Sequence, residues 1–159
     1  PVTSVFNDAA GTDSQFLDLA LGTSGSETVP AVAYRDKNGD CYFQRFNQTL
    51  SSVSTAVQLS SEACLFPTIH WISKTSQFVV TWGEVNSSNS NFYEIRMSLI
   101  TLGSTDTASS PLTVADTGTT IDFRHLDTDY YADGDWVAVF YRSRLFEAIR
   151  VHGFHVPGL

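Results

Sequence analysis

Charged residues are scarce in this chain, and lysine is the scarcest of them. Charged side chains make up 16% of the 159 residues, and the balance of 17 acidic against 9 basic residues gives a net charge of −8. Nucleic-acid binding depends on clustered lysine and arginine side chains that neutralise phosphate charge. The composition therefore argues against a nucleic-acid partner.

Long apolar runs are also absent. No run approaches the roughly 18 residues that a transmembrane helix needs, and the chain does not open with the basic and apolar segments of a signal peptide. We therefore expect no membrane insertion. The start at Pro1 and the linker-like residues 155–159 lead us to expect a processed form or part of a longer chain.

The sequence has instead short runs of β-branched and aromatic residues, separated by Gly, Asn and Ser. With 42% hydrophobic and 13% aromatic residues the chain can bury a core, and its length suits one domain. We expect residues 16–21 to be a buried strand and residues 22–27 and 103–110 to be loops. The full set of expected strands is residues 1–7, 16–21, 29–35, 41–46, 55–59, 66–72, 78–82, 92–97, 111–115, 121–126, 136–142 and 145–154.

The clearest hairpin joins residues 29–35 to residues 41–46 through Asn38 and Gly39, which can take the positive φ values of a tight turn. The spacing of Asp36, Asn38 and Asp40 also hints at a calcium loop, but the glycine comes too early for that pattern. We interpret the segment as a turn.

Similar strands recur at intervals of about 50 residues, which is typical of a repeat architecture. The second strands of three units contain Tyr34, Trp82 and Tyr141, and the third strands contain Arg45, Arg96 and Arg150. We therefore predict a single all-β domain over residues 1–159, made of four-stranded antiparallel repeats at residues 8–60, 61–117 and 118–159. The third repeat lacks a fourth strand, and Val2, Val5 and Phe6 resemble it. We expect that N-terminal strand to complete the last repeat or a neighbouring copy.

Residues 66–100 carry the progression Pro-x-Ile, Phe-Val-Val-Thr-Trp and Tyr-x-Ile-Arg, and the first repeat shares Pro30, Tyr42, Arg45 and Phe46 with it. This progression resembles the tandem repeats of large bacterial secreted and surface proteins. The resemblance implies β-propeller-like blades and a cell-surface setting, and it attaches no catalytic or binding residue. A β-trefoil or a β-prism also suits three four-stranded units of this length.

Two features favour an extracellular, disulfide-bonded glycoprotein. Cys41 and Cys64 are interpreted as a disulfide, with buried free thiols as the alternative. Asn47-Gln48-Thr49 and Asn86-Ser87-Ser88 match the N-glycosylation pattern and fall in expected turns. Asn47 and Asn86 are therefore candidate glycosylation sites.

An acidic segment is the candidate metal site. Asp127, Asp129, Asp133 and Asp135 could supply oxygen ligands to Ca²⁺ from a tight loop, whereas a solvated turn is the plainer interpretation. Elsewhere, His70, His125, His152 and His155 lack metal spacing. Glu84, Glu94 and Glu147 are weak candidates for a glycosidase carboxylate pair.

The aromatic and arginine pairs Tyr34 with Arg45, Trp82 with Arg96 and Tyr141 with Arg150 allow two interpretations. Each arginine could stack on an aromatic ring between sheets, or each pair could bind a sugar. We name no catalytic residue and expect no enzyme and no required cofactor. The leading hypothesis is a structural or adhesive module that self-assembles through its terminal strands, with other copies or adjoining repeats as partners. The alternative is a multivalent lectin that binds glycans.

Overall fold

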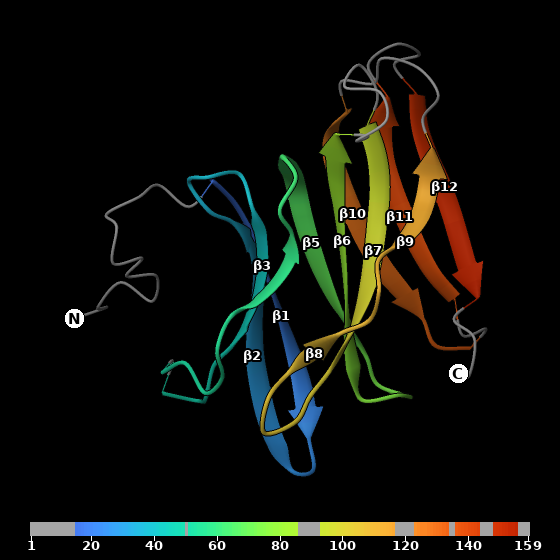
Figure 1. Cartoon of the computed structure of the whole chain (residues 1–159). Coiled ribbons are helices and arrows are strands. Elements are labelled where there is room, and N and C mark those ends of the chain that lie inside the picture. Colours follow the sequence, from blue (N-terminus) through green and yellow to red (C-terminus); the bar gives the residue numbers. More distant parts are fainter. Residues whose placement is uncertain are drawn as a thin grey trace.

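The computed structural model describes residues 15–49, 51–85, 93–116, 123–133, 136–143 and 148–155. Every regular element within these ranges is a β-strand (Figure 1). The described ranges contain no helix that could span a membrane. The predicted all-β fold is confirmed, because short runs of Val, Ile, Phe, Tyr and Trp fit a pleated, half-buried surface better than a helix.

The described strands form three antiparallel sheets, each of which runs up and down in chain order. The N-terminal sheet contains β1 (Gln15–Ser24), β2 (Glu27–Arg35), β3 (Cys41–Arg45) and β4 (Val57–Ser60). The central sheet contains β5 (Cys64–Ile72), β6 (Gln77–Val85) and β7 (Tyr93–Thr101), with β8 (Thr107–Ala108) and β9 (Leu112–Asp116) paired to opposite ends of β7. The C-terminal sheet contains β10 (Phe123–Tyr131), β11 (Trp136–Ser143) and β12 (Ala148–His155).

The central sheet lies between the other two (Figure 1). Its Phe78, Val80 and Trp82 pack against Ala33 and Phe43 of the N-terminal sheet in one core. The opposite face of the central sheet forms a second core with the C-terminal sheet, made of Ile72, Val79, Ile95, Met97, Val114, Leu126, Val137, Val139 and Tyr141. Because neighbouring strand residues point to opposite faces, alternate apolar residues of β6 serve the two cores in turn.

The first strands of the three sheets lie next to one another and are joined by polar contacts. The Oδ2 atom of Asp18 in β1 accepts a hydrogen bond from the backbone N–H of Ile69 in β5, at 2.9 Å. Between the central and C-terminal sheets, the buried hydroxyls of Thr68, Thr81 and Thr128 lie 2.5 to 2.8 Å apart. These contacts satisfy polar groups that packing removes from water.

The predicted strands are confirmed in the described ranges, with corrections to their limits. Residues 22–27 are not a loop, because β1 and β2 continue to a tight turn at Gly25 and Ser26. The strand expected at 121–126 continues to Tyr131, since Leu126, Thr128 and Tyr130 alternate toward the central sheet. The loop expected at 103–110 contains the short strand β8. Residues 1–7 lie outside the described residues.

The prediction that residues 16–21 are buried is wrong. Leu17, Leu19 and Leu21 are 47%, 55% and 59% exposed. The strand alternates instead: Asp18, Ala20 and Gly22 face the central sheet, and the leucines point away from it.

The hairpin between β2 and β3 confirms the turn interpretation of residues 36–40. The Asp36 carboxylate accepts backbone hydrogen bonds from Asn38 at 2.9 Å and from Asp40 at 2.8 Å. Gly39 has a φ of 96°, which an L side chain rarely adopts. Asn38 does not share the positive φ that the sequence suggested for both turn residues.

Close packing at Gly22 gives a test of this arrangement. A Cβ atom at Gly22 would lie 2.5 Å from Trp71 Cε3 and 2.6 Å from Phe78 Cζ, both in the central sheet. We expect Gly22→Ala to lower the free energy of unfolding by about 1–3 kcal/mol through overpacking. Urea unfolding followed by fluorescence measures this.

Gly153→Ala is the matched control, because the nearest atom to its Cβ would be Trp136 Cε3 at 3.4 Å. It should change stability by less than about 0.5 kcal/mol. Equal effects of the two substitutions would contradict the packing of β1 on the central sheet.

Candidate functional site

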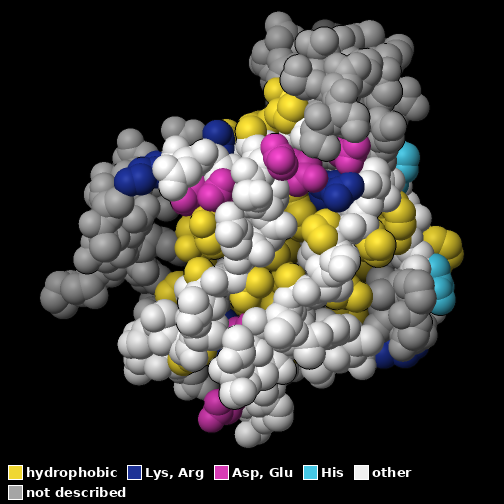
Figure 2. All heavy atoms as spheres, viewed as in Figure 1, with side chains coloured by type: hydrophobic (Ala, Val, Ile, Leu, Met, Phe, Trp, Pro, Cys, Tyr) yellow, Lys and Arg dark blue, Asp and Glu magenta, His cyan; other side chains and the backbone are white. Residues whose placement is uncertain are grey.

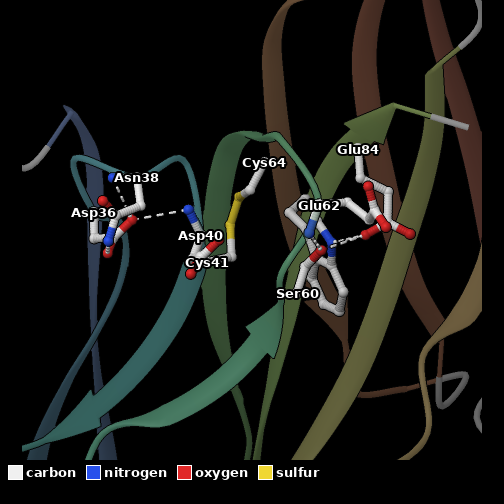
Figure 3. Close-up of a disulfide and its surroundings, with 9 residues drawn as sticks. Asp36, Asn38, Asp40, Cys41, Ser60, Glu62, Cys64 and Glu84 are labelled. Atoms are coloured by element: carbon white, nitrogen blue, oxygen red, sulfur yellow. Dashed lines mark hydrogen bonds between the residues drawn. A yellow bond between two sulfur atoms is a disulfide. The ribbon is translucent and has the colours of Figure 1, made fainter. Parts of the chain in front are cut away.

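Polar side chains gather where the N-terminal and central sheets meet, at the end of β6 and the start of β7. The Oε2 atom of Glu84 accepts hydrogen bonds from Trp82 Nε1 at 2.9 Å and from Ser60 Oγ at 2.7 Å (Figure 3). Its Oε1 atom lies 3.1 Å from Arg96 Nε. Figure 2 shows acidic and basic side chains grouped in the upper part of the described surface, above an area where hydrophobic side chains lie among uncharged ones.

Arg96 lies between two carboxylates on neighbouring strands. Glu84 and Glu94 face each other across β6 and β7, and Arg96 Nη1 lies 2.9 Å from Glu94 Oε2. Arg96 also donates to Thr113 Oγ1 at 2.5 Å. An arginine between paired carboxylates offsets their repulsion. Both oxygens of Glu84 are engaged, which gives this carboxylate a structural role between the sheets. Glu147 lies outside the described residues.

A second network fixes the loop after β7 to the N-terminal sheet. Asp106 has a fully buried side chain, and its Oδ2 atom lies 2.9 Å from Arg45 Nε and 2.7 Å from Ser54 Oγ. Its Oδ1 atom accepts the N–H of Gly103 at 3.1 Å, and Arg45 Nη2 donates to the Gly103 carbonyl at 2.7 Å. A buried carboxylate with these partners holds two segments that are distant in sequence.

The predicted aromatic and arginine pairs have different outcomes. Tyr34 and Arg45 do not pair, because Tyr34 is opposite Tyr42 in the ladder and stacks on it, while Arg45 is opposite Ala31 and points to the other face. Trp82 and Arg96 are ladder partners. Trp82, however, is fully buried between the sheets, so its ring face is closed to a sugar.

The third pair is only partly described. Tyr141 and Arg150 are ladder partners, but the Arg150 side chain lies outside the described residues. The Tyr141 hydroxyl lies 3.1 Å from His152 Nε2, and the two rings stack with their centroids 5.5 Å apart. Because Tyr141 is buried in the core beside the central sheet, this aromatic also packs between sheets.

The acidic segment does not form the expected loop. Asp127 and Asp129 are exposed residues of β10, and each accepts the backbone N–H of the next residue at 2.8 Å. Asp129 Oδ1 also lies 3.6 Å from His70 Nε2. Asp133 follows in the turn, and Asp135 is outside the described residues. Within the described ranges, no three His, Cys, Asp or Glu side chains are grouped to hold a metal ion.

The disulfide between Cys41 and Cys64 is confirmed. It connects the first residue of β3 to the first residue of β5, and therefore ties the N-terminal sheet to the central sheet (Figure 3). Asn47 lies on an exposed turn, where its Oδ1 atom accepts the N–H groups of Thr49 and Ser51. Asn86 lies outside the described residues.

Two hollows lie beside the networks and the first strands described above. One, of about 440 Å³, is lined by turn residues around Asn47 together with Arg45, which is already bound to Asp106. The other, of about 240 Å³, lies where the first strands begin and is lined by Phe16, Leu17, Asp18, Phe66, Pro67, Thr68, Leu126 and Asp127.

The most unusual surface feature is a set of exposed apolar side chains, which the sequence reasoning did not identify. Of the ten large hydrophobic side chains that are exposed in the described residues, four belong to β1 and four lie on the C-terminal sheet. The two groups are Phe16, Leu17, Leu19 and Leu21, and Tyr131, Trp136, Phe140 and Val151. Alternation of Leu17, Leu19 and Leu21 with Asp18 was the signal that could have revealed the first group.

The buried Asp106 gives a test of the seam between the sheets. Asp106→Asn should lower the free energy of unfolding by roughly 3 kcal/mol, because Arg45 is left without its charge partner in a largely buried position. Thermal and urea unfolding measure the loss. Glu62→Gln, at an exposed position, is the control and should be neutral within about 0.5 kcal/mol. A neutral Asp106→Asn variant would contradict the anchoring role.

No protein-family model matches the chain, and a search of curated proteins finds no match. The described polar networks are engaged in holding sheets together, and the surface that stands out is apolar and lies at the two ends of the stack of sheets.

Proposed function

We propose that this chain is a non-enzymatic structural or adhesive module that associates with like sheets at both ends of its own stack. The observation that carries the proposal is the placement of exposed apolar side chains on the two outward faces, those of the N-terminal and C-terminal sheets that point away from the central sheet. Contiguous apolar surface of this kind marks interaction sites on soluble proteins.

The sheet pattern supports an arrangement of consecutive propeller-like blades. Each sheet runs up and down in chain order, and β5 lies beside both β1 and β10. In this proposal the three sheets are repeats of one unit, and further sheets of the same kind cover the two outward faces. Such units bury a continuous core only by stacking on neighbours.

The terminal strands are proposed to contribute to this association. Among the described strands, four form the N-terminal sheet, and β8 and β9 together occupy the fourth position of the central sheet. In the C-terminal sheet, β12 stands at the edge of the described strands. An edge strand offers unpaired backbone groups to an added strand. We propose that Val2, Val5 and Phe6 of a neighbouring copy supply it.

An extracellular or cell-surface setting belongs to the same proposal. The disulfide between Cys41 and Cys64 supports it, because such bonds persist in oxidising compartments. The lectin alternative loses its main support, because Trp82 is buried and Tyr34 does not pair with Arg45. The proposed partners are other copies of the chain or adjoining sheets of a longer one.

Sedimentation velocity of the full chain tests this function. The wild type should associate in a concentration-dependent way, and removal of residues 1–7 should weaken association by at least about tenfold, a loss of about 1.4 kcal/mol. A variant that keeps Val2, Val5 and Phe6 but carries Thr3→Ser and Asn7→Ser is the control. A wild type that stays monomeric at every concentration would contradict the function, and unchanged association of the shortened chain would contradict strand addition.

A further inference from the structure

We infer that the outward face of the C-terminal sheet packs head-to-tail on the outward face of the N-terminal sheet of a second copy of this chain. The first face presents Tyr131, Trp136, Phe140 and Val151, and the second presents Leu17, Leu19 and Leu21. This inference rests on the proposed function, since it specifies which surfaces make the association.

Contacts between neighbouring sheets place the three sheets in a common register. By these contacts Val32 in β2, Val80 in β6 and Val139 in β11 correspond, although Val32 lies two residues farther from its hairpin turn than the other two. Their partners in the first strands are Leu19, Ile69 and Thr128 respectively. Every position on an outward face can therefore be compared with its counterpart inside the stack.

On the N-terminal sheet, the outward face carries residues whose counterparts are buried. Leu19 is 55% exposed, whereas Ile69 is 4% and Thr128 is 5% exposed. Ile69 and Thr128 each face the sheet that precedes their own in the chain. Leu19 thus has the position of an interface residue, although no sheet precedes its own among the described residues. Its ladder partner Val32, on the same face, is 2% exposed, so the exposed part of this face is the β1 edge.

The outward face of the C-terminal sheet shows the same relation. Phe140 is 36% exposed, and its counterparts Thr81 and Ala33 are both at 0%. Val151 is 57% exposed, and its counterparts Met97 and Phe43 are at 3% and 0%. These two residues are ladder partners, so they form one continuous patch.

The internal interfaces determine which faces meet. In both of them, the face that holds Ala33 or Thr81 packs on the face of the next sheet that holds Val80 or Val139. The outward face with Phe140 corresponds to the faces that hold Ala33 and Thr81, and the outward face with Val32 corresponds to the faces that hold Val80 and Val139. A contact between copies that follows the same pattern joins two different faces, and it is therefore heterologous.

A polar contact inside the stack has a counterpart at the open end. Asp18 accepts the N–H of Ile69 in the next sheet, and it also accepts the N–H of its neighbour Leu19 at 2.9 Å. Asp127 stands at the same register position as Asp18, is exposed, and likewise accepts the N–H of its neighbour Thr128. The C-terminal sheet therefore offers a carboxylate where the first strand of a second copy would lie.

Complementation between two variants tests the inference. Leu19→Asp disables the face on the N-terminal sheet, and Val151→Asp disables the face on the C-terminal sheet. Each variant alone should be monomeric at concentrations where the wild type associates. An equimolar mixture should form a 1:1 complex that grows no further, because each variant keeps the face that the other lacks. Sedimentation velocity measures all four samples.

Leu112→Asp is the matched control, because Leu112 is 54% exposed on β9, away from both faces. It should associate as the wild type does. Circular dichroism and melting temperature establish that each variant is folded, and Leu21→Asp with Phe140→Asp provide a second pair if one is not.

These measurements distinguish failure of the head-to-tail interface from failure of the proposed function. Association by the wild type, together with a mixture that stays monomeric or a Val151→Asp variant that still associates, overturns the head-to-tail interface and leaves the proposed function in place. A wild type that is monomeric throughout overturns both.

Discussion

The structure depends on one constraint: each strand points its side chains alternately to two faces, and an apolar face must be covered. The central sheet satisfies this constraint on both sides, with Trp82 and Phe78 in one core and Val79 and Ile95 in the other. The N-terminal and C-terminal sheets each cover one face. On their second faces the leucines of β1 and the side chains of Phe140 and Val151 stay exposed, while Val32 beside Leu19 is buried, and the proposed association follows from that imbalance.

The two internal interfaces are held differently. The N-terminal and central sheets share the disulfide between Cys41 and Cys64, the Arg45 to Asp106 pair and the hydrogen bond from Ser60 to Glu84. The C-terminal sheet is joined to the central sheet by apolar packing and the threonine hydroxyl cluster. We interpret the first interface as a fixed unit, and the second as the pattern for contacts that need no covalent link.

Much of the fold could be predicted from the sequence, because strand formation is a local property. Alternation and β-branched residues located the strands, and Asn38 with Gly39 located a hairpin turn. Cys41 and Cys64 pointed to the disulfide because they are the two cysteines of the sequence. The end of β10 was harder to predict, because Asp127 and Asp129 resemble loop residues. They are instead exposed positions of an alternating strand.

The candidate site was less predictable, because it depends on contacts between distant segments. Arg45 binds Asp106 across 61 positions of sequence, and no local pattern links them. Spacing also misled the pairing of Tyr34 with Arg45, since Arg45 lies three residues beyond the Tyr42 that is opposite Tyr34. Residues 16–21 alone could not reveal that only one face of β1 is covered, because which face is covered depends on where the neighbouring sheet lies.

Hydroxyl-radical footprinting at low and high protein concentration tests the central claim most directly, because it reports which side chains lose solvent contact on association. The account predicts that Leu19, Trp136 and Phe140 become protected together as concentration rises, while Leu112 stays equally reactive. Constant reactivity of Leu19, Trp136 and Phe140 in samples that associate, or protection of Leu112 in their place, would contradict it.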